Sequence, residues 1–205
     1  MSVSAQEGHV ADNGNLSMVV HFPPVMNLSG DQLFDFCQVN RGLRIEHNEH
    51  GELIIMSPTG GESSNRNAEL TMQLRIWAKR NGTGTSFDSS AGFLLANGAM
   101  RSPDAAWLRL SRWNALTAEQ RKKFVPLCPD FVVELRSPSD SLDALQDKMQ
   151  EYLANGAEMG LLVDPEQKRV HVYRRGREMQ ILENPEIVAC DPVLPGFALD
   201  LREIW

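Results

Sequence analysis

Two short segments place acidic side chains beside or within apolar runs, where a carboxylate is costly unless it is paired, hydrogen-bonded or bound to metal. Asp104 ends the sequence Ser-Pro-Asp at 102–104, directly before an apolar run, and Glu134 lies inside the run 131–135. A cation, Arg136, follows Glu134 by two residues. Two carboxylates and a nearby cation are the groups needed to hold a divalent ion beside a phosphodiester. The segments favour a metal-dependent nuclease as the hypothesis to test.

The spacing of these residues also predicts how they lie. Successive side chains alternate faces along a strand, so Glu134 and Arg136 should share one face. Asp104 stands where the preceding strand begins, and if the two strands pair, its carboxylate can reach the same ion as that of Glu134. Mg²⁺ (or Mn²⁺) suits one or two carboxylates with retained waters. Arg136 can stabilise negative charge on a phosphate, but it stays protonated and is a poor proton shuttle.

Two helical residues are further candidates. Glu69 flanks an apolar stripe and could supply a third carboxylate, and Lys148 borders another stripe and can reach inward along its aliphatic stem. Each candidate also has a structural alternative. Asp104 fits a turn, Glu134 with Arg136 fits an ordinary ion pair, and the two helical residues fit solvated helix edges.

Periodicity and capping patterns predict the elements that must position these groups. We expect helices at about 29–37, 63–79, 117–124 and 142–153, and strands at 43–47, 52–56, 92–95, 104–110, 131–135, 160–163, 169–173 and 178–182. No repeat, low-complexity tract or linker divides the chain. This order predicts one mixed α/β domain over residues 21–205, after a flexible N-terminal tail at 1–20.

Composition excludes several classes of protein. The formal net charge of −7 argues against an unselective DNA coat, although not against a nuclease whose acidic groups hold a metal. The five histidines lack the spacing of a zinc hydrolase, and neither a GxSxG motif nor a glycine-rich phosphate loop is present. The N-terminal segment has no apolar core for a signal peptide, and no run approaches the ~18 residues of a membrane span. Three widely spaced cysteines fit reduced thiols in the cytoplasm.

Several segments together carry a family resemblance. They are 51–60 (GELIIMSPTG), 65–69 (NRNAE), 101–107 (RSPDAAW), 128–139 (CPDFVVELRSPS), 148–152 (KMQEY), 163–165 (VDP) and 194–201 (LPGFALDL) with the final Trp205. Over residues 28–205 the chain resembles the Uma-two family of endonucleases, within the PD-(D/E)xK restriction-endonuclease-like superfamily. The resemblance implies an α/β, restriction-endonuclease-like core: a central mixed β-sheet flanked by helices.

The resemblance also implies roles for the candidate residues. Asp104 and Glu134 match the two acidic metal ligands, and Glu69 matches an acidic residue of the first helix that assists as a ligand or orients water. The lysine that usually follows the second acidic residue by two positions is replaced by Arg136. Either Arg136 substitutes for it, or Lys148 from the neighbouring helix does.

The function that these residues and the resemblance imply is a Mg²⁺- or Mn²⁺-dependent endonuclease that hydrolyses phosphodiester bonds of DNA. We expect a cytoplasmic homodimer with no membrane association. The candidate catalytic residues are Glu69, Asp104, Glu134, Arg136 and Lys148. The alternative is a nuclease fold that has lost catalysis and serves as a DNA-binding or protein-interaction module, which the displaced lysine and the acidic net charge favour.

Overall fold

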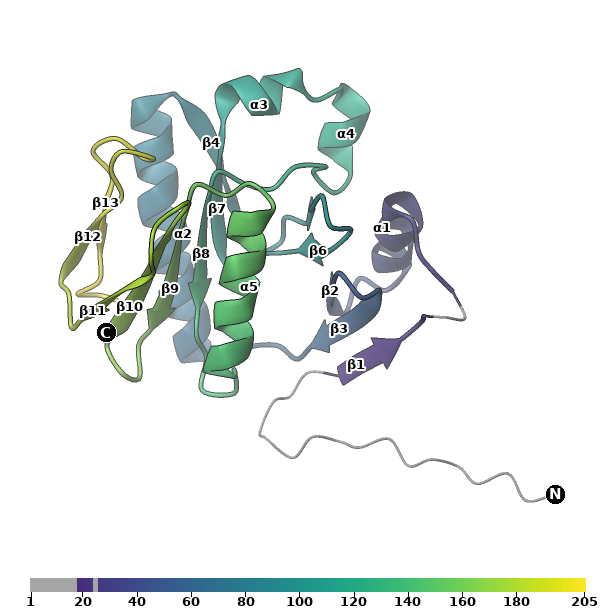
Figure 1. The fold of residues 1–205 in the computed structure, drawn as a ribbon, viewed down its shortest axis with the longest axis horizontal. Helices are drawn as coiled ribbons and strands as arrows, with labels where there is room; N and C mark the ends of the chain where they lie inside the picture. Colours follow the sequence, from purple (N-terminus) through teal and green to yellow (C-terminus); the bar gives the residue numbers. More distant parts are fainter. Residues whose placement is uncertain (1–17, 24–25) are drawn as a thin grey trace, which may run out of the picture.

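The computed structural model of the chain (Figure 1) describes residues 18–23 and 26–205. Its helices are α1 (Gly30–Val39), α2 (Gly61–Asn81), α3 (Leu110–Ala115), α4 (Ala118–Lys122) and α5 (Leu142–Ala154). Its strands are β1 (Met18–His21), β2 (Arg44–His47), β3 (Glu52–Met56), β4 (Gly84–Asp88), β5 (Phe93–Leu94), β6 (Met100–Arg101), β7 (Ala105–Arg109), β8 (Phe131–Leu135), β9 (Met159–Asp164), β10 (Arg169–Arg174), β11 (Gln180–Glu183), β12 (Ile187–Ala189) and β13 (Ala198–Asp200).

The central element is a six-stranded mixed sheet with the order β11-β10-β9-β8-β7-β4. The β8 and β9 strands run parallel, and the other neighbours are antiparallel. Every residue of β8 and β9 is buried. Both faces of these strands are therefore covered, which explains why their sequences are nearly continuous apolar runs.

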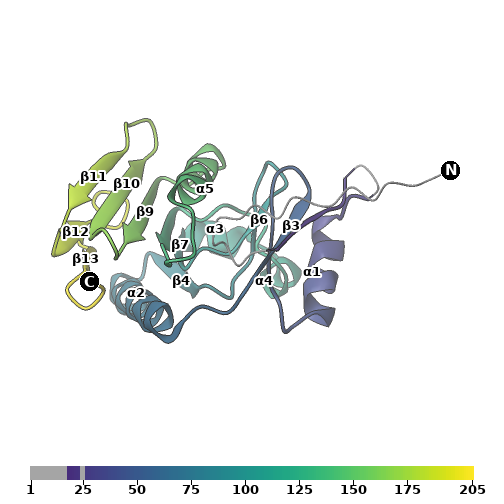
Figure 2. The same cartoon turned by 90° about the horizontal axis from the view of Figure 1, so that it is seen from below.

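Helices α2 and α5 cover opposite faces of this sheet (Figure 2). Leu74 of α2 belongs to the same buried cluster as Trp107 of β7. Met149 and Tyr152 of α5 belong to a second cluster with Leu108, the next residue along β7. Because neighbouring strand residues point to opposite faces, one strand contributes to both cores.

A second, five-stranded sheet has the order β1-β3-β2-β6-β5 and forms the N-terminal side of the molecule (Figure 1). Helix α1 packs on it through Leu33, which is buried with Ile45 and Leu53. Ser29 caps this helix by accepting from the Gln32 amide, and the Gln32 side chain accepts from the Ser29 amide in return. Residues of both sheets line one cavity, among them Arg44 and Met56 from this sheet and Glu134 from the central sheet.

Most of the predicted elements are confirmed, with boundaries shifted by a few residues. Three differences are informative: Leu110 begins α3 rather than ending a strand, β4 (Gly84–Asp88) was not predicted, and the β12–β13 hairpin was not predicted. Strand β1 includes residues 18–20, which the sequence had assigned to the tail, and it pairs with β3. The rest of the tail, residues 1–17, lies outside the described residues.

The expectations about membrane spans and cysteines can be compared with the described residues. No helix among them is long and apolar enough to cross a membrane. Cys37, Cys128 and Cys190 are all free, and the last two are buried.

Candidate active site

Asp104 and Glu134 lie opposite each other at the ends of two neighbouring strands. The antiparallel register pairs Ala105 with Val133, so the next residue outward on each strand is Asp104 on one side and Glu134 on the other. Both side chains belong to buried residues, 7% and 3% exposed. Both line one cavity of about 410 Å³. The predicted strand pairing therefore brings the two carboxylates to the same cavity.

Asp104 is held in place by donors from three directions. Its Oδ2 accepts from the Leu135 backbone N–H at 2.8 Å, which ties the carboxylate to β8. Its Oδ1 accepts from Asn67 Nδ2 at 2.8 Å and lies 3.4 Å from Arg44 Nη2. Burial would lower the pKa of the Arg44 guanidinium, but Asp104 and Glu134 raise it above its ordinary value. The charge on Asp104 is thus balanced inside the cavity.

Glu134 points from β8 toward α5. Tyr152 donates its hydroxyl proton to Glu134 Oε1 at 2.9 Å, and Lys148 Nζ lies 3.0 Å from the same oxygen. Both contacts use the same carboxylate oxygen, Oε1. Burial raises the pKa of Glu134 to about 7, with Lys148 opposing and Asp104 reinforcing that shift. Burial therefore disfavours the charged form of Glu134, and the ammonium of Lys148 opposes that effect.

Lys148 lies between two carboxylates. Its Nζ is 3.0 Å from Glu134 Oε1 and 2.8 Å from Glu46 Oε1. Burial would lower the pKa of the ammonium group, but the two carboxylates raise it above its ordinary value. Lys148 therefore remains protonated and can act as a cation and a hydrogen-bond donor, not as a base.

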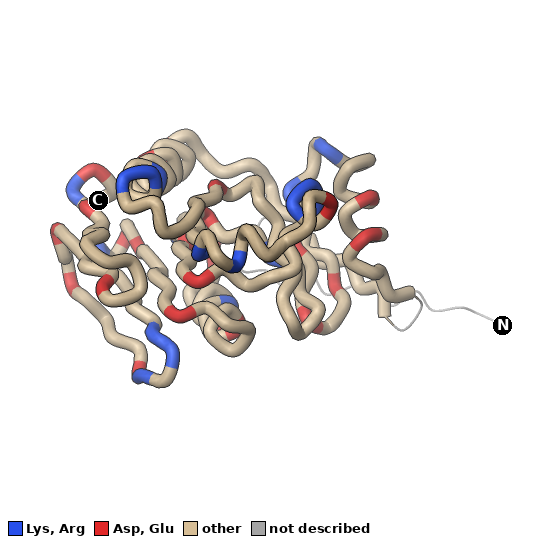
Figure 3. The backbone as a smooth tube through the Cα atoms, turned by 90° about the horizontal axis from the view of Figure 1, so that it is seen from above, with Lys and Arg blue, Asp and Glu red and all other residues tan. Residues whose placement is uncertain are grey.

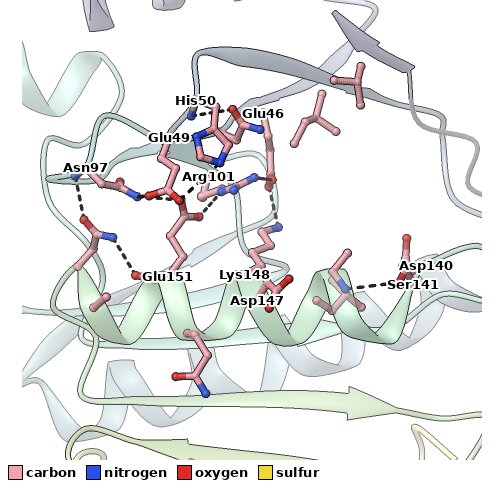
Figure 4. A pocket seen from close by; sticks show the side chains of 18 of the residues that line it. Glu46, Glu49, His50, Asn97, Arg101, Asp140, Ser141, Asp147, Lys148 and Glu151 are labelled. Atoms are coloured by element: carbon pink, nitrogen blue, oxygen red, sulfur yellow. Dashed lines mark hydrogen bonds and ion pairs between the residues drawn. The ribbon is translucent and has the colours of Figure 1, made fainter. Parts of the chain in front are cut away.

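An outer layer of charged residues supports Lys148 from the side of the second sheet (Figure 4). Glu46 Oε1 accepts from the Ser102 backbone N–H at 3.0 Å, and its Oε2 pairs with Arg101 at 3.2 Å. Arg101 in turn pairs with Glu151 of α5 at 2.6 Å. Glu46, Arg101 and Glu151 line a second cavity of about 890 Å³, which Lys148 also lines.

Arg136 lies away from the carboxylate pair. Its Nη1 is 2.6 Å from Oδ2 of Asp164, a fully buried residue at the end of β9, and its Nε donates to the Asp140 carbonyl at 3.3 Å. Arg136 is not among the residues that line the 410 Å³ cavity. The sequence did not decide whether Arg136 or Lys148 accompanies the carboxylates. In the structure, Lys148 lies beside Glu134.

Glu69 is also directed elsewhere. Its Oε1 accepts from Gln73 Nε2 at 2.9 Å, one turn later on α2, and it does not line the cavity. Helix α2 instead presents Ser63 and Asn67 to the cavity. Residues two positions apart on a helix are rotated by roughly 200°, which explains why Asn67 faces Asp104 and Glu69 does not.

Sequence reasoning missed four residues that complete the site: Arg44, Glu46, Asn67 and Tyr152. One of them, Glu46, could have been recognised from the sequence. It is a carboxylate within a predicted strand, which is the same pattern that identified Glu134. The other three are ordinary residue types for a strand or a helix edge. Only the packing of α2, α5 and β2 around Asp104 and Glu134 identifies them.

The residues present fit a magnesium or manganese ion. Among the described residues, no three or more His, Cys, Asp or Glu side chains gather into a metal cluster. Mg²⁺ does not need such a cluster, since it is commonly held by one or two carboxylates while it keeps several waters. Asp104 and Glu134 supply the carboxylates, and the cavity beside them is large enough for waters and a phosphate.

The fold and the carboxylate pair place this protein in the class of α/β proteins with a restriction-endonuclease-like fold. A similar solved structure, described as "a putative nuclease belonging to DUF820" from Anabaena variabilis ATCC 29413, has a TM-score of 0.66 and 22% sequence identity. The match covers 78% of this chain and 88% of that chain. No curated protein matches the chain.

The chain belongs to the Uma2 family, described as "Putative restriction endonuclease", whose profile matches residues 31–202. The matched segment contains both sheets from β2 onward and all the candidate residues named above.

Proposed function

We propose that this protein is a Mg²⁺- or Mn²⁺-dependent endonuclease that hydrolyses phosphodiester bonds of DNA. The observation that carries the proposal is the meeting of Asp104 and Glu134 in one cavity, with Lys148 Nζ 3.0 Å from Glu134. Family membership supports nuclease activity in general. The metal requirement and the DNA substrate are our inference from the chemistry of the site.

Asp104 and Glu134 would hold the ion, which when bound activates water for attack and neutralises charge on the phosphoryl oxygens. Asp104 is fixed by the Leu135 amide, and Glu134 by the Tyr152 hydroxyl. Lys148 would donate a hydrogen bond to the phosphate or to the attacking water, because two carboxylates keep it protonated. We assign Arg136 a positioning role through Asp164, and Glu69 a role on the surface of α2.

The fold also limits how DNA is bound. In the view of Figure 3, Lys and Arg residues are dispersed among Asp and Glu residues rather than gathered into a broad basic face. With a net charge of −7, the protein has little general attraction for phosphate. We therefore infer that DNA binding depends on the divalent ion and on a few local cations such as Lys148 and Arg44.

Cleavage of supercoiled plasmid tests the proposal. Wild-type protein should nick the plasmid when Mg²⁺ or Mn²⁺ is added and should stop when the ion is chelated. Asp104→Asn and Glu134→Gln should abolish nicking, and Lys148→Met should slow it by about 10²–10³-fold, the usual effect of removing one charge-stabilising donor. Glu69→Gln is the matched control and should cleave like the wild type.

Arg136→Met distinguishes the two cations. If Lys148 is the functional cation, Arg136→Met should lose stability while the folded protein keeps nicking activity. Metal-independent nicking, or equal activity in wild type and Asp104→Asn purified in parallel, would overturn the proposed function.

We further propose that the active form is a homodimer in the cytoplasm. Two copies supply two sites for cleavage of both strands, and two-fold pairing is the most common symmetric assembly. Three free thiols suit a reducing compartment. Light scattering on the purified protein would give the mass of the assembly, and linear plasmid products would indicate paired cuts.

A second candidate function is a DNA-binding or protein-interaction module without catalysis. The observation that favours it is the pairing of Arg136, at the usual lysine position, with buried Asp164. DNA binding by wild type without any cleavage, across a range of plasmid and linear substrates, would support this alternative.

A further inference from the structure

The side-chain amide of Asn67 has a hydrogen-bonded nitrogen and an oxygen without a hydrogen-bond partner among the described residues. Its Nδ2 donates to Asp104 Oδ1 at 2.8 Å. Its Oδ1 is buried and is one of the few such side-chain atoms with no hydrogen-bond partner among the described residues. A buried acceptor without a partner costs free energy, and each such group in a folded protein calls for an explanation.

The orientation of this amide is fixed by its neighbour. If the amide were rotated to exchange oxygen and nitrogen, Oδ1 would face the Asp104 carboxylate and two acceptors would meet. The hydrogen bond to Asp104 therefore fixes which end of the amide is the oxygen, and this oxygen is the atom without a partner among the described residues.

The surroundings of Asn67 indicate what that oxygen could bind. Asn67 lines the 410 Å³ cavity together with Asp104, Glu134 and Lys148. An amide oxygen is a hard, neutral ligand of the type that accompanies carboxylates around divalent cations. Lys148 is already paired with Glu134 and Glu46, so an ion held by the carboxylates is the ligand that best suits the free oxygen.

We propose that Asn67 Oδ1 is a third protein ligand of the divalent cation, while its N–H holds Asp104 in the ligating orientation. This inference rests on the proposed function, since it adds a ligand to the same site. It gives helix α2 a direct part in the site through a neutral residue. Glu69, the acidic residue two positions later, bonds to Gln73 instead.

Mn²⁺ binding, followed by electron paramagnetic resonance or calorimetry without DNA, tests the inference on full-length protein. Asn67→Leu removes both the donor and the acceptor and should weaken Mn²⁺ binding by about 10–100-fold. Asn67→Asp loses the donor to Asp104 but keeps the oxygen, and it should bind Mn²⁺ at least as tightly as the wild type. Glu69→Gln, from the same helix, is the matched control and should not change binding.

The two variants separate a ligand from a residue that only orients Asp104. If Asn67→Asp is weakened as much as Asn67→Leu, only the N–H matters and the inference is wrong. It is also wrong if Asn67→Leu binds Mn²⁺ within about twofold of the wild type. Circular dichroism verifies folding, and Asn67→Ala replaces Asn67→Leu if the larger side chain disturbs α2.

The failure of this inference is distinguishable from failure of the proposed function. If wild type binds Mn²⁺ and Asp104→Asn does not, the metal site stands whatever Asn67 does. If wild type binds no Mn²⁺ at all, both the metal site and the role of Asn67 are overturned.

Discussion

Two buried carboxylates, Glu46 and Glu134, flank the ammonium of Lys148, and a third, Asp104, pairs with Arg44 in the same cavity. Buried ion pairs contribute little net stability, because the cost of removing charges from water offsets their attraction. Removing one partner is nevertheless expensive, since it leaves the other charge buried and uncompensated. The cluster is therefore better explained by the positions it imposes on Lys148 and Glu134 than by the stability it adds.

Glu46 gives a test of this cluster through its pH dependence. Burial alone would raise its pKa, but Lys148 and Arg101 together lower it below the ordinary value of 4.5. A carboxyl group whose pKa is lowered by folding stabilises the protein above its unfolded-state pKa, and that contribution is lost as the pH falls. Glu46→Ala should thus reduce the free energy of unfolding by about 3–5 kcal/mol at neutral pH, and the difference should shrink below pH 4.5.

Urea unfolding of wild type and Glu46→Ala across this pH range measures the effect. Glu119→Ala, which removes an ion pair whose two side chains are both exposed, is the control and should cost far less. A difference between wild type and Glu46→Ala that stays constant with pH would contradict an ionised, paired Glu46.

At the scale of elements, helix α5 and strand β8 set the distance between Lys148 and Glu134. Lys148 and Tyr152 are four residues apart and so share the face of α5 that meets Glu134. The helix can approach the sheet closely because β9 has glycine at position 160. A Cβ atom there would overlap Met149 Cε of α5 and lie 3.1 Å from Val132 Cγ2.

Gly160→Val should therefore push α5 away from the sheet. We expect a loss of about 1–3 kcal/mol in the free energy of unfolding, the usual cost of overpacking a core, together with slower plasmid nicking. Gly42→Ala is the control, because a Cβ atom there has no neighbour within 4 Å and the residue lines neither cavity. Thermal unfolding and nicking assays on both variants measure these effects. A Gly160→Val protein with wild-type stability would contradict close packing of α5 against β9.

At the scale of the whole molecule, the 410 Å³ cavity joins the two sheets. Arg44 and Met56 line it from the five-stranded sheet, while Asp104, just before β7, and Glu134 of β8 line it from two interior strands of the six-stranded sheet. Helices α2 and α5 contribute Asn67 and Lys148. An ion bound here would therefore connect segments that are far apart in the sequence and would stabilise the fold as a unit.

Metal binding should consequently raise the stability of the whole domain. A ligand that binds only the folded state at 100 times its Kd adds about 2.7 kcal/mol to the free energy of unfolding. Saturating Mn²⁺ should raise the Tm of the wild type and leave that of Asp104→Asn unchanged. Ca²⁺ and a chelator serve as further conditions, and a Tm shift of equal size in Asp104→Asn would locate the ion elsewhere.

Local pattern predicted much of this architecture. Alternation and continuous apolar runs predicted β2, β3, β8, β9 and β10, and the capping boxes at Ser29 and Thr117 predicted where α1 and α4 begin. The short β4 and the β12–β13 hairpin were not predicted. Both lie at sheet edges or on the surface, where half-exposed strands leave a weak pattern and pairing with neighbours decides the conformation.

The sequence by itself predicted that two carboxylates, Asp104 and Glu134, lie beside or within apolar runs, where an unpaired carboxylate is costly. It left open which cation and which residue of the first helix accompany them. Only the tertiary structure decided that Lys148 rather than Arg136 lies beside Glu134, and that Asn67 rather than Glu69 lies beside Asp104. The physical reason is that the groups a side chain contacts depend on how its helix or strand packs against the rest of the fold. The neighbouring residues in the sequence do not specify that packing.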